Sequence, residues 1–514
     1  MLLDLINQWK SAEVGRSALI DDHEAVDLPT LAQRVEAMTA WLKKQHLAAV
    51  ALLADNSIDW VVTDLAAQQA NIICLPLPPF FTPEQQRHCM AEAGIALLIA
   101  EPNQALVEAT DPMPCPLQRL VAIAVEQTTP AKAAPSGTQK ITFTSGSTGT
   151  PKGVCLSVSH QWQVASALAQ TVALDQPRHL CLLPLATLLE NLAGVYAPLL
   201  SGGSVYLPSA ATRGLSGSSG LVLADMCGAI SDTQPNSMIA LPQLLSALVL
   251  ATQSGWQPPR SLRFVAVGGG KVDPVLLAHA ANLGIPAFEG YGLSEAGSVV
   301  ALNTVGVNRA GCSGRVLPHC KVSVENGEVV VSGSCFLGYL GQQDSWHPTR
   351  VRTGDLGAIE FADSQQWLAI NGRCKNLLIT SFGRNISPEW VESTIQSNPY
   401  ISHCVVVGDG RPCLTALISA PLTVTDNALQ NAVDQANAQL PDYARIGHWL
   451  RIEAAHWQSL YTANGRPRRD LIQQHFAAAI ANGYATNPHY NTATVSPQTA
   501  STHPSQSVEH ETAQ

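Results

Sequence analysis

Apolar positions alternate between two periods along the first hundred residues. Residues 30–44 carry leucine, valine and methionine three and four positions apart, which predicts an amphipathic helix. The apolar runs 50–53 and 71–77 predict buried strands, with a helix at 60–69 between them. The same rhythm recurs at 263–283, where a strand (263–267) precedes a helix (273–283). Strands that alternate with helices predict a parallel sheet covered by helices.

The pattern changes towards the C-terminus. From about Gly311 it predicts short alternating strands at 321–324, 328–332 and 367–370. After Arg373 a smaller α+β segment follows, with strands predicted at 377–380 and 404–407 and helices at 388–396 and 426–439. Loops are predicted at 127–139, and at the Gly/Ser-rich stretch 213–220, which we expect to be mobile. Residues 486–514 lack Leu, Ile, Phe and Trp, which predicts a disordered tail.

Composition narrows the classes of function. The chain has 514 residues, of which 46% are hydrophobic, so it can bury a sizeable core and is expected to hold more than one domain. Lys plus Arg is 29 and Asp plus Glu is 39, giving a net charge of −10, and only 13% of residues are charged. This balance argues against a nucleic-acid partner, which needs a basic surface, and against a wholly disordered protein. An enzyme is the first hypothesis.

Twelve cysteines do not form a disulfide or zinc pattern. They include no Cys-x-x-Cys and no paired Cys/His spacing, and most lie in apolar surroundings. We expect buried, reduced thiols and therefore a cytoplasmic protein. No uncharged apolar run approaches the roughly 20 residues that span a bilayer, so no transmembrane segment is predicted. No cationic amphipathic helix is apparent, which leaves at most weak peripheral contact with a membrane.

The sharpest motif is ITFTSGSTGTPKGV at residues 141–154. A β-prone run enters a loop in which glycines let backbone N–H groups turn inward, hydroxyls add donors and Lys152 adds a charge, a combination that suits phosphate. The spacing is not that of a Walker A loop. The residues predicted to hold phosphate are Thr144, Ser145, Gly146, Ser147, Thr148, Gly149 and Lys152.

With this loop the chain resembles the adenylate-forming superfamily of AMP-binding enzymes, which includes acyl-CoA synthetases, peptide-synthetase adenylation domains and luciferases. Matching motifs recur in the family's order over about residues 25–475. The resemblance implies an α/β fold in which an N-terminal AMP-binding domain (1–373) combines helix-covered sheets with a distorted barrel-like β subdomain. A small mobile α+β C-terminal domain (374–485) and a disordered tail (486–514) would follow.

Two motifs then imply the adenine and metal sites. Gly268-Gly269-Gly270 follows a predicted strand, and such a cluster lets a ligand approach the backbone closely. In Tyr291-Gly292-Leu293-Ser294-Glu295 the resemblance implies that Tyr291 stacks on adenine, Ser294 contacts the α-phosphate and Glu295 binds Mg²⁺. Thr144 matches the family's second metal-side residue, and carboxylate oxygen suits hard Mg²⁺.

Two further motifs imply the ribose contacts and a hinge. Asp355 matches the aspartate that accepts hydrogen bonds from both ribose hydroxyls, and Arg373 matches an arginine that contacts ribose and phosphate. Lys375 falls at the hinge of the C-terminal domain, and Gly383 matches the glycine that admits pantetheine. Many members carry aspartate where this chain has Asn376, so the hinge salt bridge of those members is not expected here.

The last motif departs from the family pattern. In ANGRPRR, Arg466 stands where the family lysine bridges the attacking carboxylate and the α-phosphate. Arginine keeps the charge, but its planar fork is not interchangeable with an ammonium. The segment LPLATLLE resembles a long-chain acyl-CoA synthetase sequence; Glu190 is retained, and Thr187 replaces histidine in the expected acyl pocket.

The resemblance implies ATP- and Mg²⁺-dependent activation of a carboxylic acid, favouring a medium- to long-chain fatty acid. The acyl-adenylate would then react with CoA, with Arg466, Lys152 and Glu295 as catalytic residues. Two alternatives remain open. One is transfer to the phosphopantetheine of an acyl carrier protein. The other is a nucleotide- or acyl-binding pseudoenzyme, suggested by Arg466 and Thr187.

Overall fold

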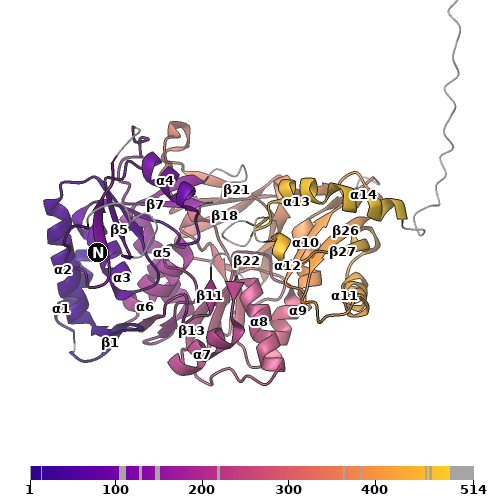
Figure 1. Cartoon of the computed structure of the whole chain (residues 1–514), viewed down its shortest axis with the longest axis horizontal. Helices are drawn as coiled ribbons and strands as arrows, with labels where there is room; N and C mark the ends of the chain where they lie inside the picture. The colour runs from indigo at the N-terminus through magenta and orange to yellow at the C-terminus, as the bar shows by residue number, and fades with distance from the viewer. Residues whose placement is uncertain are drawn as a thin grey trace, which may run out of the picture.

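The computed structural model describes residues 2–12, 14–102, 112–126, 130–144, 151–216, 220–362, 365–381, 384–457, 460–461 and 466–486. Two large sheets with covering helices form the N-terminal part, and a smaller unit lies beside them (Figure 1). Most of the predicted elements are present, within a few residues of their expected bounds.

The smaller of the two large sheets holds the predicted strands 50–53 and 71–77. Neighbouring strands β4, β3 and β5 are parallel, whereas β7 and β8 form an antiparallel pair. Its strands, in spatial order, are β20 (Gly338–Tyr339), β8 (Lys152–Leu156), β7 (Lys140–Thr144), β4 (Ile73–Pro76), β3 (Ala49–Leu53), β5 (Leu97–Ala100) and β6 (Val121–Ala124).

The larger sheet has thirteen strands. It is parallel from β15 to β1, and the short strands predicted after Gly311 extend it in antiparallel fashion. The order is β18 (Cys320–Glu325), β19 (Glu328–Gly333), β21 (Arg350–Ala362), β22 (Gln365–Arg373), β17 (Gly314–Val316), β16 (Ala301–Leu302), β15 (Ala287–Tyr291), β14 (Phe264–Val267), β13 (Ser237–Ala240), β9 (Arg178–Leu180), β10 (Ser204–Leu207), β1 (Ser17–Asp21) and β2 (Ala25–Asp27).

Helices cover these sheets, and their ends carry the expected signals. Asp27 and Ser57 cap α2 and α3 with their side chains, and Lys43 and Lys44 lie in the last turn of α2, where cations are favoured. The helices are α1 (Leu2–Lys10), α2 (Leu28–Lys44), α3 (Ile58–Ala70), α4 (Pro83–Glu92), α5 (Val158–Val172), the π-helix η1 (Glu190–Tyr196), α6 (Ala197–Leu200), α7 (Leu223–Thr233), α8 (Pro242–Gln253), α9 (Pro274–Asn282), and the short 3₁₀ turns η2 (Ser294–Ala296) and η3 (Gln343–Ser345).

One predicted loop is more regular than expected. The Gly/Ser-rich stretch 213–220 contains two short strands, β11 (Leu215–Ser216) and β12 (Gly220–Leu221), which pair as an antiparallel hairpin. Leu215 and Leu221 pack against the core cluster around Met238, which the glycine- and serine-rich composition does not suggest.

The C-terminal unit has its own core, built on a three-stranded sheet. Strand β26 lies between antiparallel β25 and parallel β27. Its elements are η4 (Cys374–Asn376), the hairpin β23 (Leu378–Ile379) and β24 (Asn385–Ile386), α10 (Pro388–Gln396), β25 (His403–Val407), β26 (Leu414–Ser419), α11 (Asp426–Gln439), η5 (Asp442–Ala444), β27 (Ile446–Arg451), α12 (Ala454–Trp457), α13 (Arg469–His475) and α14 (Ala477–Thr486).

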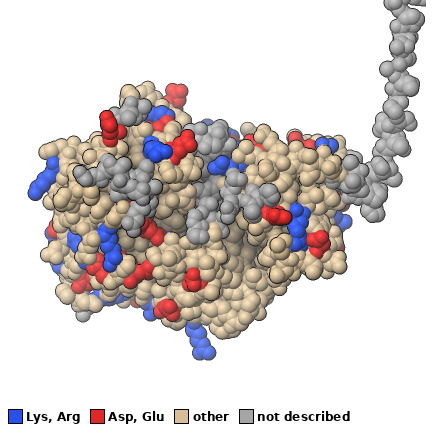
Figure 2. All heavy atoms as spheres, in the orientation of Figure 1, with Lys and Arg blue, Asp and Glu red and all other residues tan. Residues whose placement is uncertain are grey.

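The prediction of mostly buried thiols agrees with the structure. All twelve cysteines are free, and only Cys374 is exposed. Among the described helices none is long and apolar enough to cross a membrane. On the face shown in Figure 2, charged side chains are scattered over a largely uncharged surface, consistent with their low number. The predicted tail lies outside the described residues from 487 onwards.

A buried polar cluster joins four elements of the N-terminal part. The Lys140 ammonium on β7 lies 2.9 Å from the Asp64 carboxylate on α3, and both side chains are at most 1% exposed. The amide of Asn191 and the hydroxyl of Tyr196, both on η1, donate to Asp64. Trp162 of α5 stacks on Tyr196 with ring centroids 4.5 Å apart. The cluster therefore fixes η1 against the strand that leads into the predicted phosphate loop.

Replacing Asp64 with alanine should destabilise the protein by about 3–5 kcal/mol, because it leaves the Lys140 ammonium buried without its counter-charge. The free energy of unfolding from urea denaturation would measure this. Glu36→Gln, which removes the acid of the partly exposed Lys10–Glu36 pair, serves as the control and should change stability by about 1 kcal/mol or less. The double variant Asp64→Leu with Lys140→Met should recover much of the loss. An equal loss in Asp64→Ala and Glu36→Gln would contradict this account.

Candidate active site

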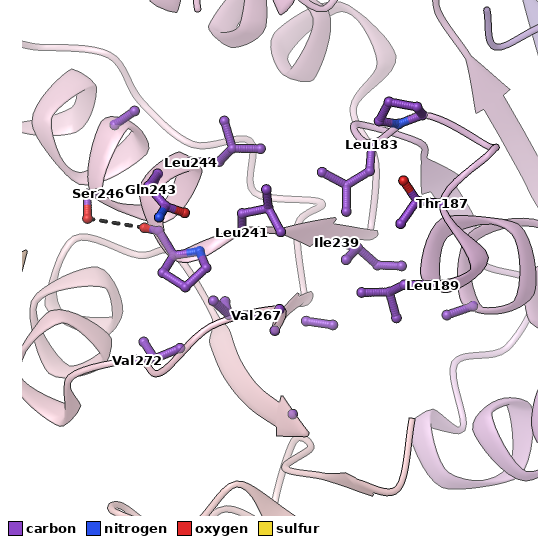
Figure 3. A pocket seen from close by; sticks show the side chains of 18 of the residues that line it. Leu183, Thr187, Leu189, Ile239, Leu241, Gln243, Leu244, Ser246, Val267 and Val272 are labelled. Carbon is purple, nitrogen blue, oxygen red and sulfur yellow. Dashed lines mark hydrogen bonds between the residues drawn. The ribbon is translucent and has the colours of Figure 1, made fainter. Parts of the chain in front are cut away.

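One cavity of about 920 Å³ joins residues of both parts of the chain. It is bordered by β13, β14, α8 and η1 on the N-terminal side and by Tyr400, Trp457 and Arg466 on the C-terminal side. Figure 3 shows part of its wall, where the apolar side chains of Leu189, Ile239 and Leu241 gather around the cavity. Such a mostly apolar hollow with a few polar groups is typical of a small-molecule site.

The predicted glycine loop follows β14 at the C-terminal ends of the parallel strands, the edge at which such sheets bind ligands. Gly268 and Gly269 line the cavity, and Gly269 has a φ of +83°, which favours glycine. Gly292 meets a different constraint, since a Cβ there would overlap the carbonyl group of Ser298. Gly269 allows the loop backbone to lie at the cavity, and Gly292 allows its own backbone to pack against Ser298.

Tyr291, Asp355 and Arg373 form a connected triad. The Tyr291 hydroxyl at the end of β15 donates to Asp355 Oδ2 at 2.7 Å, and Asp355 Oδ1 lies 2.8 Å from Arg373 Nε. Asp355 pairs with Arg373 across β21 and β22, so the strand register brings the two motifs together. Burial raises the pKa of the Asp355 carboxyl, and the Arg373 guanidinium opposes that rise. Burial and the Asp355 charge raise the pKa of Tyr291, which keeps its hydroxyl a donor.

Arg466 reaches the same place from the C-terminal unit. It lines the cavity, which leaves its side chain solvent-accessible although protein surrounds it on the other sides. Burial and the neighbouring Arg373 lower the pKa of Arg466, whereas the Asp355 and Glu295 carboxylates act in the opposite direction. Arg373, Asp355 and Glu295 therefore lie close enough to Arg466 to act on its charge.

The segment around Arg466 is held on both flanks. Tyr461 and Pro467 form an antiparallel bridge, and the Arg468 N–H donates to the Leu460 carbonyl at 2.8 Å. Arg469 makes two hydrogen bonds of 2.6 Å to the Glu392 carboxylate of α10, a bidentate pair that is largely buried. These contacts determine where the chain presents Arg466.

Glu295 lies in the 3₁₀ turn η2 beside Ser294. The Tyr339 hydroxyl donates to Glu295 Oε1 at 2.7 Å, and the Lys152 ammonium lies 5.4 Å from the centre of the Tyr339 ring. Burial and the Glu295 charge raise the pKa of Tyr339, so its hydroxyl remains a donor. Thr144 ends β7. Its hydroxyl and the Glu295 carboxylate offer oxygen atoms, the ligands that Mg²⁺ prefers. Ser145, Gly146, Ser147, Thr148 and Gly149 lie outside the described residues.

Comparison with known proteins settles the family. The AMP-binding enzyme family matches residues 6–340, and the AMP-binding enzyme C-terminal domain matches residues 375–488. The chain belongs to the AMP-binding enzyme family.

Its relatives within the family act on different acids. A long-chain-fatty-acid–CoA ligase of Mycobacterium bovis is 24% identical over 77% of this chain and 76% of its own. The structure of an anthranilate–CoA ligase in complex with anthranoyl-AMP is similar, with a TM-score of 0.78, 18% identity and coverage of 93% of this chain and 98% of that one. The o-succinylbenzoate–CoA synthetase of Bacillus subtilis, in complex with ATP and a magnesium ion, has a TM-score of 0.70 at 20% identity, covering 91% and 98%. These likenesses confirm the predicted α/β architecture with a C-terminal domain.

The hinge prediction falls on η4 (Cys374–Asn376), where the match of this AMP-binding enzyme to the C-terminal domain begins at residue 375. Burial and the nearby Arg373 lower the pKa of Lys375. The Asn376 amide donates to the Glu389 carboxylate on α10, and Glu389 also accepts from Ser387 and lies 3.5 Å from Arg469. Asn376 thus takes part in a hydrogen bond where an aspartate would meet another carboxylate. Gly383 lies outside the described residues.

The two residues predicted for the acyl pocket lie at different depths. Thr187 lines the cavity between Leu183 and Leu189 (Figure 3). Glu190 is fully buried behind that wall, where it accepts hydrogen bonds from the Leu183 N–H at 3.0 Å and pairs with His179 Nε2 at 3.1 Å. His179 itself lines the cavity and contacts Ser237 at 3.0 Å through Nδ1. Glu190 therefore contacts His179, which lines the cavity, but does not line the cavity itself.

Sequence reasoning missed three side chains that shape the site. The Tyr339 hydroxyl donates to Glu295, and His179 contacts Glu190. Lys271, the residue after the glycine loop, donates to the Ile370 carbonyl of β22. His179 and Tyr339 lie on short strands, and their partners are on other elements of the chain. No local sequence pattern therefore indicates these contacts. Lys271 follows Gly270 directly, and its position after a ligand-binding loop was an available signal.

Gly292→Ala should lower the free energy of unfolding by about 1–3 kcal/mol, because the added methyl group must displace the Ser298 backbone. Gly228→Ala provides the matched control. It lies within α7 with nothing within 4 Å of the added Cβ, and it should be neutral or slightly stabilising. Thermal denaturation of both variants measures the difference. Unchanged stability of Gly292→Ala would show that the Ser298 segment moves away freely.

Proposed function

We propose that this protein activates an apolar carboxylic acid with ATP to an acyl-adenylate and then forms the CoA thioester, releasing pyrophosphate and AMP. One observation carries the proposal. A single cavity is lined by the glycine loop and Tyr291, by the charged side chain of Arg466, and by a wall of apolar side chains. These are the three environments that adenine, a reacting phosphate–carboxylate pair and an acyl tail require.

ATP would lie across the triad and the glycine loop. Gly268, Gly269 and Gly270 would let adenine approach the backbone, with Tyr291 and Gly292 on its other side. Asp355 would accept from the ribose hydroxyls, for which a fixed, acceptor-only carboxylate is suited. Arg373, already bonded to Asp355, would keep that carboxylate charged and contact ribose and phosphate. Ser294, with Thr144–Gly149 and Lys152, would contact the phosphates.

Thr144 and Glu295 would hold Mg²⁺ beside these phosphates. The ion would neutralise charge on the phosphate oxygens when bound. Tyr339 engages one oxygen of Glu295 and so orients the carboxylate for that task. The protein's own part in this step is to position the reactants, since no nucleophilic side chain is required.

Arg466 would bridge the carboxylate of the acid and the α-phosphate during adenylation. Its neighbours support this role, because Arg373 crowds it with like charge that a phosphate between the two would relieve. Residues 374–485 would then turn as a domain about Lys375, withdraw Arg466 and present the side near Gly383 to the pantetheine of CoA. CoA is the preferred acceptor because the relatives reported above are CoA ligases.

The acid is proposed to be apolar, with a medium- to long-chain fatty acid first. Leu183, Leu189, Ile239 and Leu241 supply the wall, and Thr187 is the polar group among them. An aromatic acid is the second candidate, favoured by the structural likeness to the anthranilate–CoA ligase. The free, mostly buried thiols suit a cytoplasmic location.

Pyrophosphate release tests the proposal directly. Purified protein with ATP, Mg²⁺ and a panel of fatty and aromatic acids should release pyrophosphate with at least one apolar acid, and CoA should then convert the adenylate to a thioester. Short polar acids of equal charge provide the control for non-specific hydrolysis. Binding of ATP without pyrophosphate release from any acid would favour the pseudoenzyme instead.

Arg466→Ala should slow pyrophosphate release by about 10²–10³-fold, the usual effect of removing a group that stabilises developing charge. Thioester formation from synthetic acyl-adenylate and CoA should remain within a few-fold of the original enzyme. Arg468→Ala removes the same charge two residues away and should leave both rates nearly unchanged. Equal losses in the two half-reactions would mean that Arg466 supports the fold or CoA binding rather than adenylation.

A further inference from the structure

The sheet face that lines the cavity carries a polar pair among apolar side chains. Ser237 begins β13, and in the parallel register it lies beside His179 of β9 and Phe264 of β14. Residues two apart on a strand share a face, so Ile239 lies on the same side as Ser237. All four side chains line the cavity. Because Ser237 and His179 are only 4% and 3% exposed, they form a buried polar patch within a mostly apolar wall.

The hydrogen bonds of His179 determine which ring nitrogen carries the proton. Nε2 lies 3.1 Å from Glu190 Oε1, and Glu190 Oε2 accepts from the Leu183 N–H at 3.0 Å. Because a carboxylate only accepts, Nε2 is the donor. In the neutral imidazole Nδ1 is then an acceptor, and the Ser237 hydroxyl donates to it at 3.0 Å. The contacts from Glu190 to Ser237 therefore use the one hydrogen of the Ser237 hydroxyl.

The Ser237 oxygen keeps acceptor capacity on the side of the cavity. A hydroxyl oxygen has two acceptor lone pairs, and among the described residues none donates to this oxygen. A buried acceptor of this kind is normally satisfied by water or by a ligand that donates. The Glu190 end is closed, because a Cβ on Gly194 of η1 would overlap both Glu190 Oε1 and His179 Nε2. Ser237 is therefore the end that a ligand can reach.

The pair lies at the end of β13 that is remote from the glycine loop. β13 ends at Ala240, the register partner of Val267, and Val267 directly precedes that loop. Ile239 and Leu241 line the cavity on the way (Figure 3). At about 3.3 Å per residue, Ser237 lies about 10 Å from that edge along the strand. An extended chain advances about 3.5 Å over three bonds, so about eight bonds span this distance. A medium-chain acyl tail reaches Ser237, whereas a single aromatic ring beside the carboxylate does not.

We propose that Ser237 and His179 form a subsite that selects an acid with a hydroxyl group about eight or more bonds from its carboxylate, with this hydroxyl donating to Ser237 Oγ. The proposal rests on the proposed function, which places the carboxylate at Arg466 and the tail along the apolar wall. A hydroxyl is neutral, so it enters an apolar cavity at less cost than an ammonium or a second carboxylate. A keto oxygen only accepts, so it would face the Ser237 lone pairs with no hydrogen between them.

The first experiment measures kcat/KM for pyrophosphate release with dodecanoic acid, its 8-, 10- and 12-hydroxy derivatives, the corresponding oxo acids and 3-hydroxydodecanoic acid. The best distal hydroxy acid should exceed dodecanoic acid and its own oxo acid by about fivefold, the usual gain from one hydrogen bond. The 3-hydroxy acid should gain nothing. Ser237→Ala should reduce the preference to less than about twofold. Ser246→Ala removes another hydroxyl from the same cavity, one that is bonded to the Pro242 carbonyl, and should keep the preference.

Glu190→Gln tests the direction of the hydrogen bonds. The amide oxygen would stay on the Leu183 N–H, which turns the amide nitrogen towards His179 Nε2. Nε2 would then accept, Nδ1 would carry the hydrogen, and the Ser237 hydroxyl would be free to donate into the cavity. The oxo acids should therefore gain on the hydroxy acids, at least to equal kcat/KM. An equal loss with every acid would mean that Glu190 only supports the fold.

The subsite is overturned by an original protein that prefers no distal hydroxy acid, or that uses the oxo acid as well as the hydroxy acid. It is also overturned by Ser237→Ala that keeps the preference or loses activity equally with all acids. If Ser237→Ala does not fold, the comparison of acids in the original protein still decides. Absence of pyrophosphate release from every acid would instead reject the proposed function. Calorimetric binding of the hydroxy, oxo and unsubstituted acids would then still test the subsite, so the two failures are distinguishable.

Discussion

The buried ion pair between Lys140 and Asp64 is the constraint on which the arrangement of the site depends. Charges removed from water in this way are tolerated only when the remaining donors and acceptors are satisfied, and here Asn191 and Tyr196 provide that from η1. The pair thereby sets the position of η1 relative to β7. One side of η1 contacts this cluster, while Ala193 of η1 lines the cavity. The apolar cavity wall and the strand leading to the predicted phosphate loop are therefore held by the same cluster.

Asp355 fixes the N-terminal part of the site up to the boundary with the C-terminal part. It lies within β21 of the N-terminal part, bonds Tyr291 at the end of β15, and pairs with Arg373 at the last residue before η4. After η4, Asn376 donates to Glu389, and Glu389 lies close to Arg469. Arg469 belongs to the same segment as Arg466. A rotation about Lys375 would leave the Asp355 triad behind and move Arg466, because the triad ends before the hinge and Arg466 lies after it.

Much of this organisation could be predicted from sequence because it is local. The amphipathic spacing of α2, the apolar run of β3 and the glycines after β14 each report their own environment. The family resemblance also singled out Asp355 and Arg373 as site residues, although only the β21–β22 register brings them into contact. Glu190 illustrates the limit. Glu190 begins η1 and its partner His179 lies on strand β9, so the burial of Glu190 behind the cavity wall depends on tertiary contacts that no local period encodes. The 213–220 hairpin was missed for the same reason.

The electrostatics of the cavity give the proposed order of events a physical cause. Arg373 lies close enough to Arg466 to disfavour the charge of Arg466, whereas the Asp355 and Glu295 carboxylates favour it. A phosphate would relieve that repulsion and favour the arrangement in which Arg466 points inward. In the proposed reaction, less negative charge would hold Arg466 beside Arg373 once pyrophosphate had left. The balance would then shift towards withdrawal of the C-terminal part, the rotation proposed for the thioester step.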